Sequence, residues 1–535
     1  MRNILIIIFY SYFFSVSGQT INYTDLCKQS KKESLVPIRP GVPGLQPFWT
    51  MDDNAKMFKY APAFDFKSYN DAEYYSFSAF SFSDNQYYKF TSPNPYAPLT
   101  PIWDKLPDGE VYLKVEAVVN NDKGKSEKDW GDRGLTVFLS GVRSFYKASV
   151  FSPPYAPPAY SYRDAAMKAL KYFYNTKHIK EWYFTGKPNY EEYYLYSYSA
   201  KILRGIMESM LMYHEYFKND TALVIAKKAA NYLIEHSEPA GAPLEYLPQT
   251  YEGEGLTAKE YGKQIIMMEP SVTGTAYLEM YRKTNDKKYF QASLNIANTY
   301  IKNQLSSGTW YIRIFKETGK PASEVLCIPI QIVNFLTLLA DQYGQKQYLS
   351  AAEKAMKWVM DNPVKTYNWT GQFEDMAAAK PYQNLTKYEA GWTAWYLFDN
   401  KDKDTSYMRI AKELVAFCED QFVVWSPMAI YDYRKELSNR WFTPSVLEQY
   451  SYYAPIDASI SMMVSTFMKA YKATGDIIYR EKAIALTNSL VNNQKADGKI
   501  PTHFWKNYVD DIWINCMIFS TTILRTMEKE LDRIH

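Results

Sequence analysis

The feature that most constrains the fold is an internal repeat. Residues 281–308, "YRKTNDKKYFQASLNIANTYIKNQLSSG", recur without a gap as residues 471–498, "YKATGDIIYREKAIALTNSLVNNQKADG". Each copy ends one helical apolar pattern, passes through a short polar turn, places a Tyr and begins a second helical pattern. Two weaker copies lie between them, and the marker residues are Tyr289, Tyr348, Tyr407 and Tyr479, at spacings of 59, 59 and 72 residues. A period of about 60 residues predicts helical hairpins that must stack on one another to bury their apolar faces.

The helical pattern begins at residue 162 and continues to the end of the chain. Met408, Ala411, Val415, Cys418 and Phe422, for example, are spaced by three and four residues and define one helix face. Residues 162–535 have room for about six hairpins, and six hairpins can close on themselves. We therefore predict a mainly α protein whose residues 162–535 form an (α/α)6 toroid, with an open superhelix as the alternative.

The preceding part of the chain has a different pattern. Val111, Leu113, Val115 and Ala117 alternate with polar residues, which is typical of a strand with one buried face. We predict an N-terminal β-sandwich-like domain over residues 19–151. The stretch "SPPYAPPAY" then predicts a proline-stiffened linker over residues 152–161.

The first residues have the pattern of a secretory signal peptide, predicted here as residues 1–18. Arg2 is followed by a short apolar run and then by the small residues Ser17 and Gly18. This run is too short to span a bilayer, and no later run is long and apolar enough, so we expect no transmembrane segment. The prediction is an exported protein, periplasmic or extracellular.

Composition excludes several classes of function. The net charge of +3 comes from mixed acids and bases, which gives no basis for binding nucleic acid. Five His and four Cys, with no CxxC pair, predict no metal site and no cofactor, and we expect free buried thiols. The 49 Tyr, 13 Trp and 28 Phe indicate either a large aromatic core or an aromatic surface that stacks on sugar rings. Nothing in the pattern indicates an oligomeric state.

Five long irregular stretches between the predicted helices combine acids with aromatic residues. Function concentrates on loops held by a rigid scaffold, and paired carboxylates suit the hydrolysis of a glycosidic bond. The candidate catalytic acids are Glu374, Asp375, Glu448 and Asp457. The candidate substrate-binding residues are Glu269, Tyr382, Trp425, Arg440, Trp441, Tyr450, His503, Trp505 and Trp513. Glu269 and Asp457 each precede a helical pattern, so helix capping is the alternative role for both.

The segments "GQFEDM", "PYQNLTKYEAGWTAWYL", "CEDQFVVW", "TPSVLEQYSYYAPIDAS" and "NNQKADGKIPTHFW", together with the repeated turns, resemble the six-hairpin glycosidase superfamily of (α/α)6 barrels. That superfamily includes unsaturated glucuronyl hydrolases, the β-glucuronidases of glycoside hydrolase family 154 and polysaccharide lyases, and the glucuronyl 5-epimerases have a related helical domain. The resemblance implies an exo-acting glycoside hydrolase on a polysaccharide or oligosaccharide that contains uronic acid. A lyase or 5-epimerase on the same substrates is the first alternative, and a non-catalytic glycan-binding protein is the second.

Overall fold

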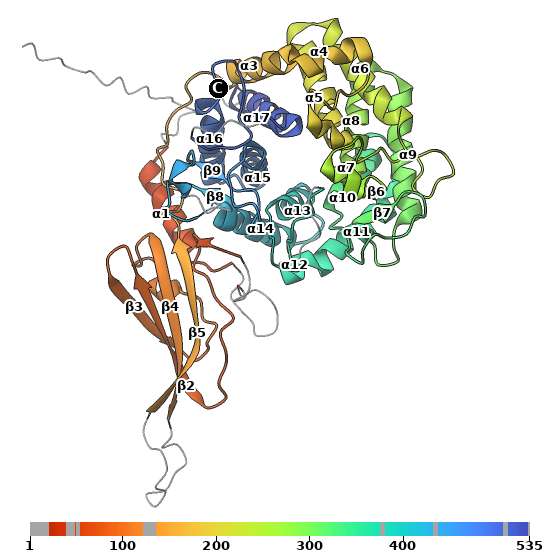
Figure 1. Cartoon of the computed structure of the whole chain (residues 1–535). Coiled ribbons are helices and arrows are strands. Elements are labelled where there is room, and N and C mark those ends of the chain that lie inside the picture. Colours follow the sequence, from red (N-terminus) through yellow and green to blue (C-terminus); the bar gives the residue numbers. More distant parts are fainter. Residues whose placement is uncertain are drawn as a thin grey trace, which may run out of the picture.

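The computed structural model describes residues 21–38, 49, 54–120, 135–374, 380–431, 437–506 and 512–532. Most of these residues form a closed ring of helices, and a β-sheet projects from the rim of that ring (Figure 1). The predicted signal peptide and Asp375 lie outside the described residues. No helix in the described ranges is long and apolar enough to cross a membrane.

Six inner helices form the inside of the ring. Each contacts the next one along the chain, and the last contacts the first, so the ring is closed. They are α5 (Ser199–Phe217), α8 (Glu269–Thr284), α10 (Ile330–Gln342), α13 (Tyr388–Asp399), α15 (Asp457–Thr474) and α17 (Ile514–Asp532).

Each inner helix forms a hairpin with an outer helix. The outer helices are α6 (Asp220–Glu235), α9 (Lys287–Asn303), α11 (Leu349–Asp361), α14 (Tyr407–Phe422), α16 (Ile477–Asn492) and α3 (Tyr162–Asn175). Five hairpins pair consecutive helices, whereas the sixth pairs α17 with α3, from opposite ends of the helical part. The predicted closed (α/α)6 toroid is therefore confirmed, and the open superhelix is excluded.

The repeated residues tie neighbouring hairpins together. The hydroxyl of Tyr348, at the start of α11, donates a 2.9 Å hydrogen bond to Asn298 on α9. In the second copy of the repeat, Asn488 accepts a 2.6 Å hydrogen bond from Tyr162 at the start of α3. Tyr162 therefore occupies the marker position of the sixth hairpin, across the point of ring closure.

The repeated glycines have a steric explanation. Gly308 and Gly498 have φ values of +104° and +98°. A Cβ at Gly308 would lie 2.5 Å from the carbonyl oxygen of Lys354, and one at Gly498 would lie 2.3 Å from that of Lys168. Both carbonyls belong to the outer helix of the next hairpin, so a side chain at either position would push two hairpins apart.

The N-terminal part contains one five-stranded sheet in the order β1-β5-β4-β2-β3, in which β1 is parallel to β5 and the other pairs are antiparallel. The strands are β1 (Met57–Phe58), β2 (Ala72–Ser81), β3 (Gln86–Ser92), β4 (Gly109–Asn120) and β5 (Leu135–Lys147). One face packs against a loop and a short helix: Phe64 of the loop and Trp103, the last residue of the helix Thr100–Trp103, contact Phe145 of β5 at ring-centroid distances of 5.6 and 6.1 Å. No second sheet faces it among the described residues. The predicted sandwich is thus confirmed only as far as a single sheet, because alternation along a strand reveals a buried face but not what covers it.

The remaining elements are short, except for a helix near the start of the chain. They are α1 (Tyr23–Ser34), α2 (Thr100–Trp103), α4 (Lys177–Thr185), α7 (Leu256–Tyr261), α12 (Pro363–Thr366), the 3-10 turns η1 (Tyr194–Ser197), η2 (Lys346–Tyr348) and η3 (Ser438–Arg440), and the strand pairs β6 (Gln264–Ile266) with β7 (Arg313–Phe315) and β8 (Val423–Val424) with β9 (Ser445–Val446).

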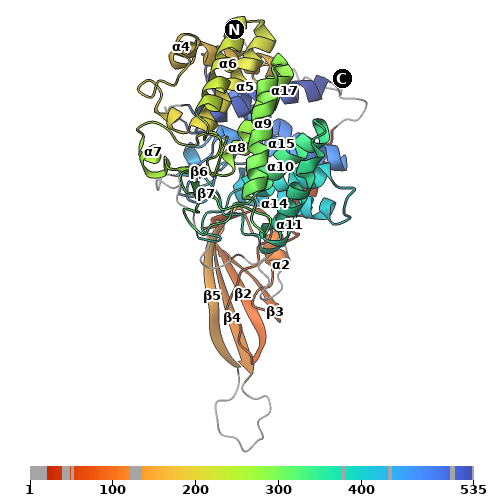
Figure 2. The same ribbon diagram turned by 90° about the vertical axis from the view of Figure 1, so that its right-hand side faces the viewer.

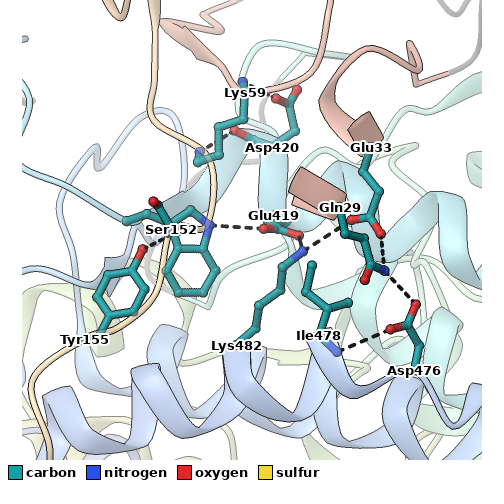
Figure 3. Close-up of polar contacts among 11 residues, drawn as sticks. Gln29, Glu33, Lys59, Ser152, Tyr155, Glu419, Asp420, Asp476, Ile478 and Lys482 are labelled. Carbon is teal, nitrogen blue, oxygen red and sulfur yellow. Dashed lines mark hydrogen bonds and ion pairs between the residues drawn. The ribbon is translucent and has the colours of Figure 1, made fainter. Parts of the chain in front are cut away.

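A buried network of charges joins the N-terminal part to the ring (Figure 3). Lys482 of α16 lies 2.7 Å from Glu419 at the end of α14 and 3.7 Å from Glu33 of α1. Next to it, the ammonium of Lys59 donates a 2.7 Å hydrogen bond to the backbone oxygen of Asp420. Burial raises the pKa of Asp420 to about 6 and lowers that of Lys59 to about 8, and each charge partly offsets the shift of the other. Because one continuous hydrophobic core also spans both parts, the sheet is packed onto the ring and is not loosely tethered to it.

Candidate active site

The long connections of the chain gather at one end of the ring. Every inner helix begins at this end, so the connections that precede the inner helices meet there, whereas those that follow them are short turns at the other end. Figure 2 shows α7, β6 and β7 on this side of the ring. The five irregular stretches picked from the sequence therefore share one end. They precede α8, α13, α15 and α17 or form the first turns of these helices.

Glu374 lies on the connection before α13 and is 5% exposed. Its carboxylate forms an ion pair with the ammonium of Lys201 on α5. The same ammonium lies 4.7 Å from the ring centroid of Trp513. The hydroxyl of Tyr251 donates a 2.8 Å hydrogen bond to the backbone oxygen of Glu374. Residues far apart in sequence thus fix both the backbone and the charge of Glu374.

Glu269 is the first residue of α8 and is 9% exposed. Burial raises the pKa of its carboxyl group, the neighbouring charge of Glu374 raises it further, and the cations of Arg204 and Lys201 oppose the shift. Its position fits the capping role that the sequence allows. However, its Oε2 atom is buried and accepts no hydrogen bond. Glu269 and Glu374 therefore form a pair of neighbouring carboxyl groups, one of which favours its protonated form.

Glu448 and Asp457 border the same site. Burial raises the pKa of the Cys516 thiol on α17 well above its usual range, and the negative charge of Asp457 raises it further. Glu448 and Glu374 also raise this pKa, whereas the cation of Lys201 lowers it. The Cys516 thiol therefore lies within electrostatic range of Asp457, Glu448 and Glu374. Three of the four predicted catalytic residues are thus brought together, and the fourth, Asp375, follows Glu374 directly in the sequence.

Both carboxylate oxygens of Asp457 are bonded within the protein, although the N-cap of α15 is Ile456. Asp457 begins α15 and is fully buried. One oxygen accepts a 2.7 Å hydrogen bond from the backbone N–H of Ala458, and the other accepts a 3.1 Å hydrogen bond from Ser520 of α17. These bonds hold Asp457 in place between α15 and α17, but they are not the capping hydrogen bond that the sequence allows.

Two ionisable residues that the sequence did not single out lie at the start of α13. Lys387 is fully buried, and burial lowers the pKa of its ammonium to about 7. It donates hydrogen bonds of 2.7 Å to the backbone oxygen of Glu448 and 2.6 Å to Ser459. Burial raises the pKa of Glu389 to about 7, although Lys387 opposes this shift. Lys387 therefore holds the backbone of one candidate acid in place.

The predicted substrate-binding residues divide into two groups. Trp513, His503 and Trp505 lie at the site end of the ring, where His503 bonds to the hydroxyl of Tyr452 and lies 5.5 Å from Trp505, measured between ring centroids. Glu269 lies in the site, as described above, and the other residues are engaged in contacts within the protein. The indole of Trp425 donates a hydrogen bond to Glu419, in the charge network that joins the N-terminal part to the ring. Tyr450 donates a hydrogen bond to Gln421, and Tyr382 donates one to the backbone oxygen of Thr366. The ring centroid of Trp441 lies 6.1 Å from that of Tyr453, and Arg440 is exposed on η3.

Five of the buried polar atoms without a hydrogen-bond partner lie in the first two turns of five inner helices. Such atoms are rare in folded proteins and indicate a place for water or a ligand. They are Arg204 Nε on α5, Glu269 Oε2 on α8, Gln331 Oε1 on α10, Glu389 Oε2 on α13 and Asn515 Oδ1 on α17. Acceptors outnumber donors, so a ligand rich in hydroxyl groups would satisfy them. Within the described ranges, no group of three or more His, Cys, Asp or Glu is arranged to hold a metal ion.

Solved structures with a similar fold act on sugars. The GH76 α-mannanase of Bacteroides thetaiotaomicron is 13% identical with a TM-score of 0.47, over 69% of this chain and 96% of its own. An unsaturated glucuronyl hydrolase specific for heparin is 11% identical with a TM-score of 0.46, over 69% and 97%. The cellobiose 2-epimerase of Spirochaeta thermophila is 10% identical with a TM-score of 0.46, over 63% and 86%. These neighbours are six-hairpin (α/α)6-barrel enzymes, the superfamily that the sequence resembles.

No protein-family model matches the chain, and no curated protein matches it. At TM-scores below 0.5, the likeness to solved structures carries no argument about the reaction. The case for a function therefore comes from the side chains of this chain.

Proposed function

We propose that this chain is a carbohydrate-active enzyme, an exo-acting glycoside hydrolase on glycans that contain uronic acid. The observation that carries the proposal is the pair of Glu269 and Glu374 at the loop end of the closed ring. Glycosidic hydrolysis needs one carboxylic acid to protonate the leaving oxygen and one carboxylate to activate water or attack carbon. The surroundings of the two residues match these two roles: burial raises the pKa of Glu269, which favours its protonated form, and Glu374 forms an ion pair with the ammonium of Lys201.

In this mechanism Glu269 is the general acid. Its buried carboxyl group keeps its proton at higher pH than an exposed one, and its unbonded Oε2 is available to the substrate. Glu374 is the ionised partner, held by Lys201. Asp375 remains a second candidate for this role because it follows Glu374 in the sequence.

The substrate class is part of the same proposal. Lys201 and Arg204 lie one turn apart on α5 beside the two acids, and such cations suit the carboxylate of a uronic acid. The indole of Trp513 beside Lys201 offers an apolar face to a sugar ring. The exo-acting mode follows from burial, since acids that are 9% and 5% exposed are more accessible to the end of a glycan than to its middle.

The test is product analysis after incubation with a panel of uronate-bearing polysaccharides and oligosaccharides. On a glycan that the parent protein cleaves, E269Q and E374Q should each lose about a hundredfold or more in rate. E317Q, at an exposed glutamate, is the matched control and should retain full activity. A loss of less than about tenfold in both variants would refute the assignment.

A lyase or epimerase is the second candidate, favoured by the contact between Tyr452 and His503. Both reactions remove the proton next to a uronate carboxylate, for which a Tyr or His can serve as base. A rise in ultraviolet absorbance from an unsaturated product would indicate a lyase, and proton exchange at carbon 5 without cleavage would indicate an epimerase. In either case Y452F should lose more activity than E269Q.

A further inference from the structure

The segment that carries Glu448, residues 447–456, is held by the ring on one side. Besides Lys387, the hydroxyl of Thr386 donates a 3.2 Å hydrogen bond to the backbone oxygen of Glu448. The side chain of Asn384 donates 2.6 Å to Gln449 and accepts 2.8 Å from the backbone of Ser451. These contacts fix the start of the segment, but they do not reach its other side.

Gln421 supports the segment from the side of the N-terminal part. It lies near the end of α14 and is 1% exposed. Its Nε2 donates 3.1 Å to the backbone oxygen of Met57 on β1 and 2.7 Å to Asp420, and its Oε1 accepts a 2.7 Å hydrogen bond from Tyr450. One buried amide thus connects three parts of the chain: the N-terminal strand β1, the outer helix α14 and the segment with Glu448.

Two further contacts join the N-terminal stretch to the segment 447–456 and to the chain beside it. The ammonium of Lys56 lies 4.6 Å from the ring centroid of Tyr453, which is fully buried. The side chain of Asn54 donates a 2.7 Å hydrogen bond to the backbone oxygen of Gln383, next to the Asn384 contact. The stretch 54–60 also contains Lys59, which is fixed to Asp420 in the junction network (Figure 3). The N-terminal stretch is therefore anchored before it reaches the segment.

We propose that residues 54–60 are a built part of the candidate site, and that Gln421 is the positioning residue that transmits their support to the Glu448 segment. The physical reason is that Gln421 satisfies a donor and an acceptor that are both buried. Removing it takes away the buried hydrogen bonds that Gln421 makes with the hydroxyl of Tyr450 and with the backbone oxygen of Met57, which favours local opening of the segment. The proposal rests on the proposed function only for the role of Glu448; the mechanical link itself does not depend on a substrate.

Hydrogen–deuterium exchange of the full chain tests this link. In Q421L, peptides covering residues 446–456 should exchange at least about fivefold faster, because the loss of these buried hydrogen bonds destabilises the closed state. Peptides from α10 and α11, on another part of the ring, should be unchanged. Q345L is the matched control: this glutamine lies in a short turn at the opposite end and should leave residues 446–456 unaffected.

Two results would overturn the proposal: unchanged exchange over residues 446–456 in folded Q421L, or an equal increase over the whole ring, which would indicate only lower global stability. If Q421L does not fold, Y450F removes the single hydrogen bond to Gln421 and should give the same local increase. On a glycan that the parent protein cleaves, Q421L should lower kcat more than it raises KM. If no glycan is cleaved, the proposed function fails while the exchange experiment still decides this inference.

Discussion

Replacing Glu389 with glutamine should stabilise the protein above neutral pH. Glu389 is buried at the start of α13, one of its oxygens accepts no hydrogen bond, and its pKa is raised from 4.5 to about 7. Below about pH 4.5 the carboxyl group is protonated in both the folded and the unfolded chain, so burial carries no charge penalty. As the pH rises from about 4.5 through 7, the unfolded chain ionises first, and stability is lost. Glutamine has the same shape and no charge, so it removes this loss.

The expected size follows from the shift. A difference of about 2.5 pKa units corresponds to about 3 kcal/mol of stability at high pH, and to less than about 1 kcal/mol at about pH 5. The entropy of unfolding is about 2.1 cal/mol/K per residue, which gives about 1.1 kcal/mol/K for a chain of 535 residues. E389Q should therefore raise Tm by about 3 °C at about pH 8.5 relative to the parent protein.

Differential scanning calorimetry at both pH values measures this difference. E317Q, at an exposed carboxylate, is the control and should show no pH-dependent change in Tm. The reasoning would be refuted if E389Q lowered Tm at high pH, or if its effect were the same at both pH values. Either outcome would mean that the Glu389 carboxylate is stabilised in the folded protein when ionised.

Two other predictions concern buried groups. K482M should lower Tm by about 3 °C, because it leaves the carboxylate of Glu419 buried without its cation. The double variant K482M/E419Q should recover part of this loss. If it recovers nothing, Lys482 and Glu419 do not act as one ion pair. In the folded protein a thiol reagent should modify at most Cys27, because Cys327, Cys418 and Cys516 are buried and burial raises the pKa of each of these thiols. All four thiols should react after denaturation. Fast labelling of more than one thiol in the native protein would contradict the buried positions.

The sequence predicts the ring better than the part before it. The repeat is visible because the same hydrogen bond, from a tyrosine hydroxyl to an asparagine of the preceding hairpin, recurs at Tyr348 and Tyr162. The β-rich part has no such repetition. Alternation in β4 predicts a buried face, but a loop with Phe64 and the short helix α2 with Trp103 cover that face, and such short segments have no periodic sequence pattern.

The candidate site is predicted from its loops and missed on its helices. Glu374 and Glu448 stand out because acids occur there beside aromatic residues in long connections. Lys201 and Arg204 lie within a helical pattern, where charges usually mark a solvated face, and only the fold brings Lys201 to Glu374 from 173 positions away. Trp425 was expected to bind substrate. It packs instead against Phe151 because the chain before α3 folds back onto α14, which no local pattern reveals.

The pairing of α17 with α3 has a consequence for how the protein is made. During synthesis, helix α3 emerges early but lacks its hairpin partner until α17, the last helix described, has left the ribosome. Five hairpins can form from neighbouring sequence, whereas this one joins segments more than three hundred residues apart and must wait. Until then, the side of α3 that packs against α17 and both ends of the unfinished ring lack their partners, so we expect a nascent chain of this kind to need protection from aggregation until α17 is available.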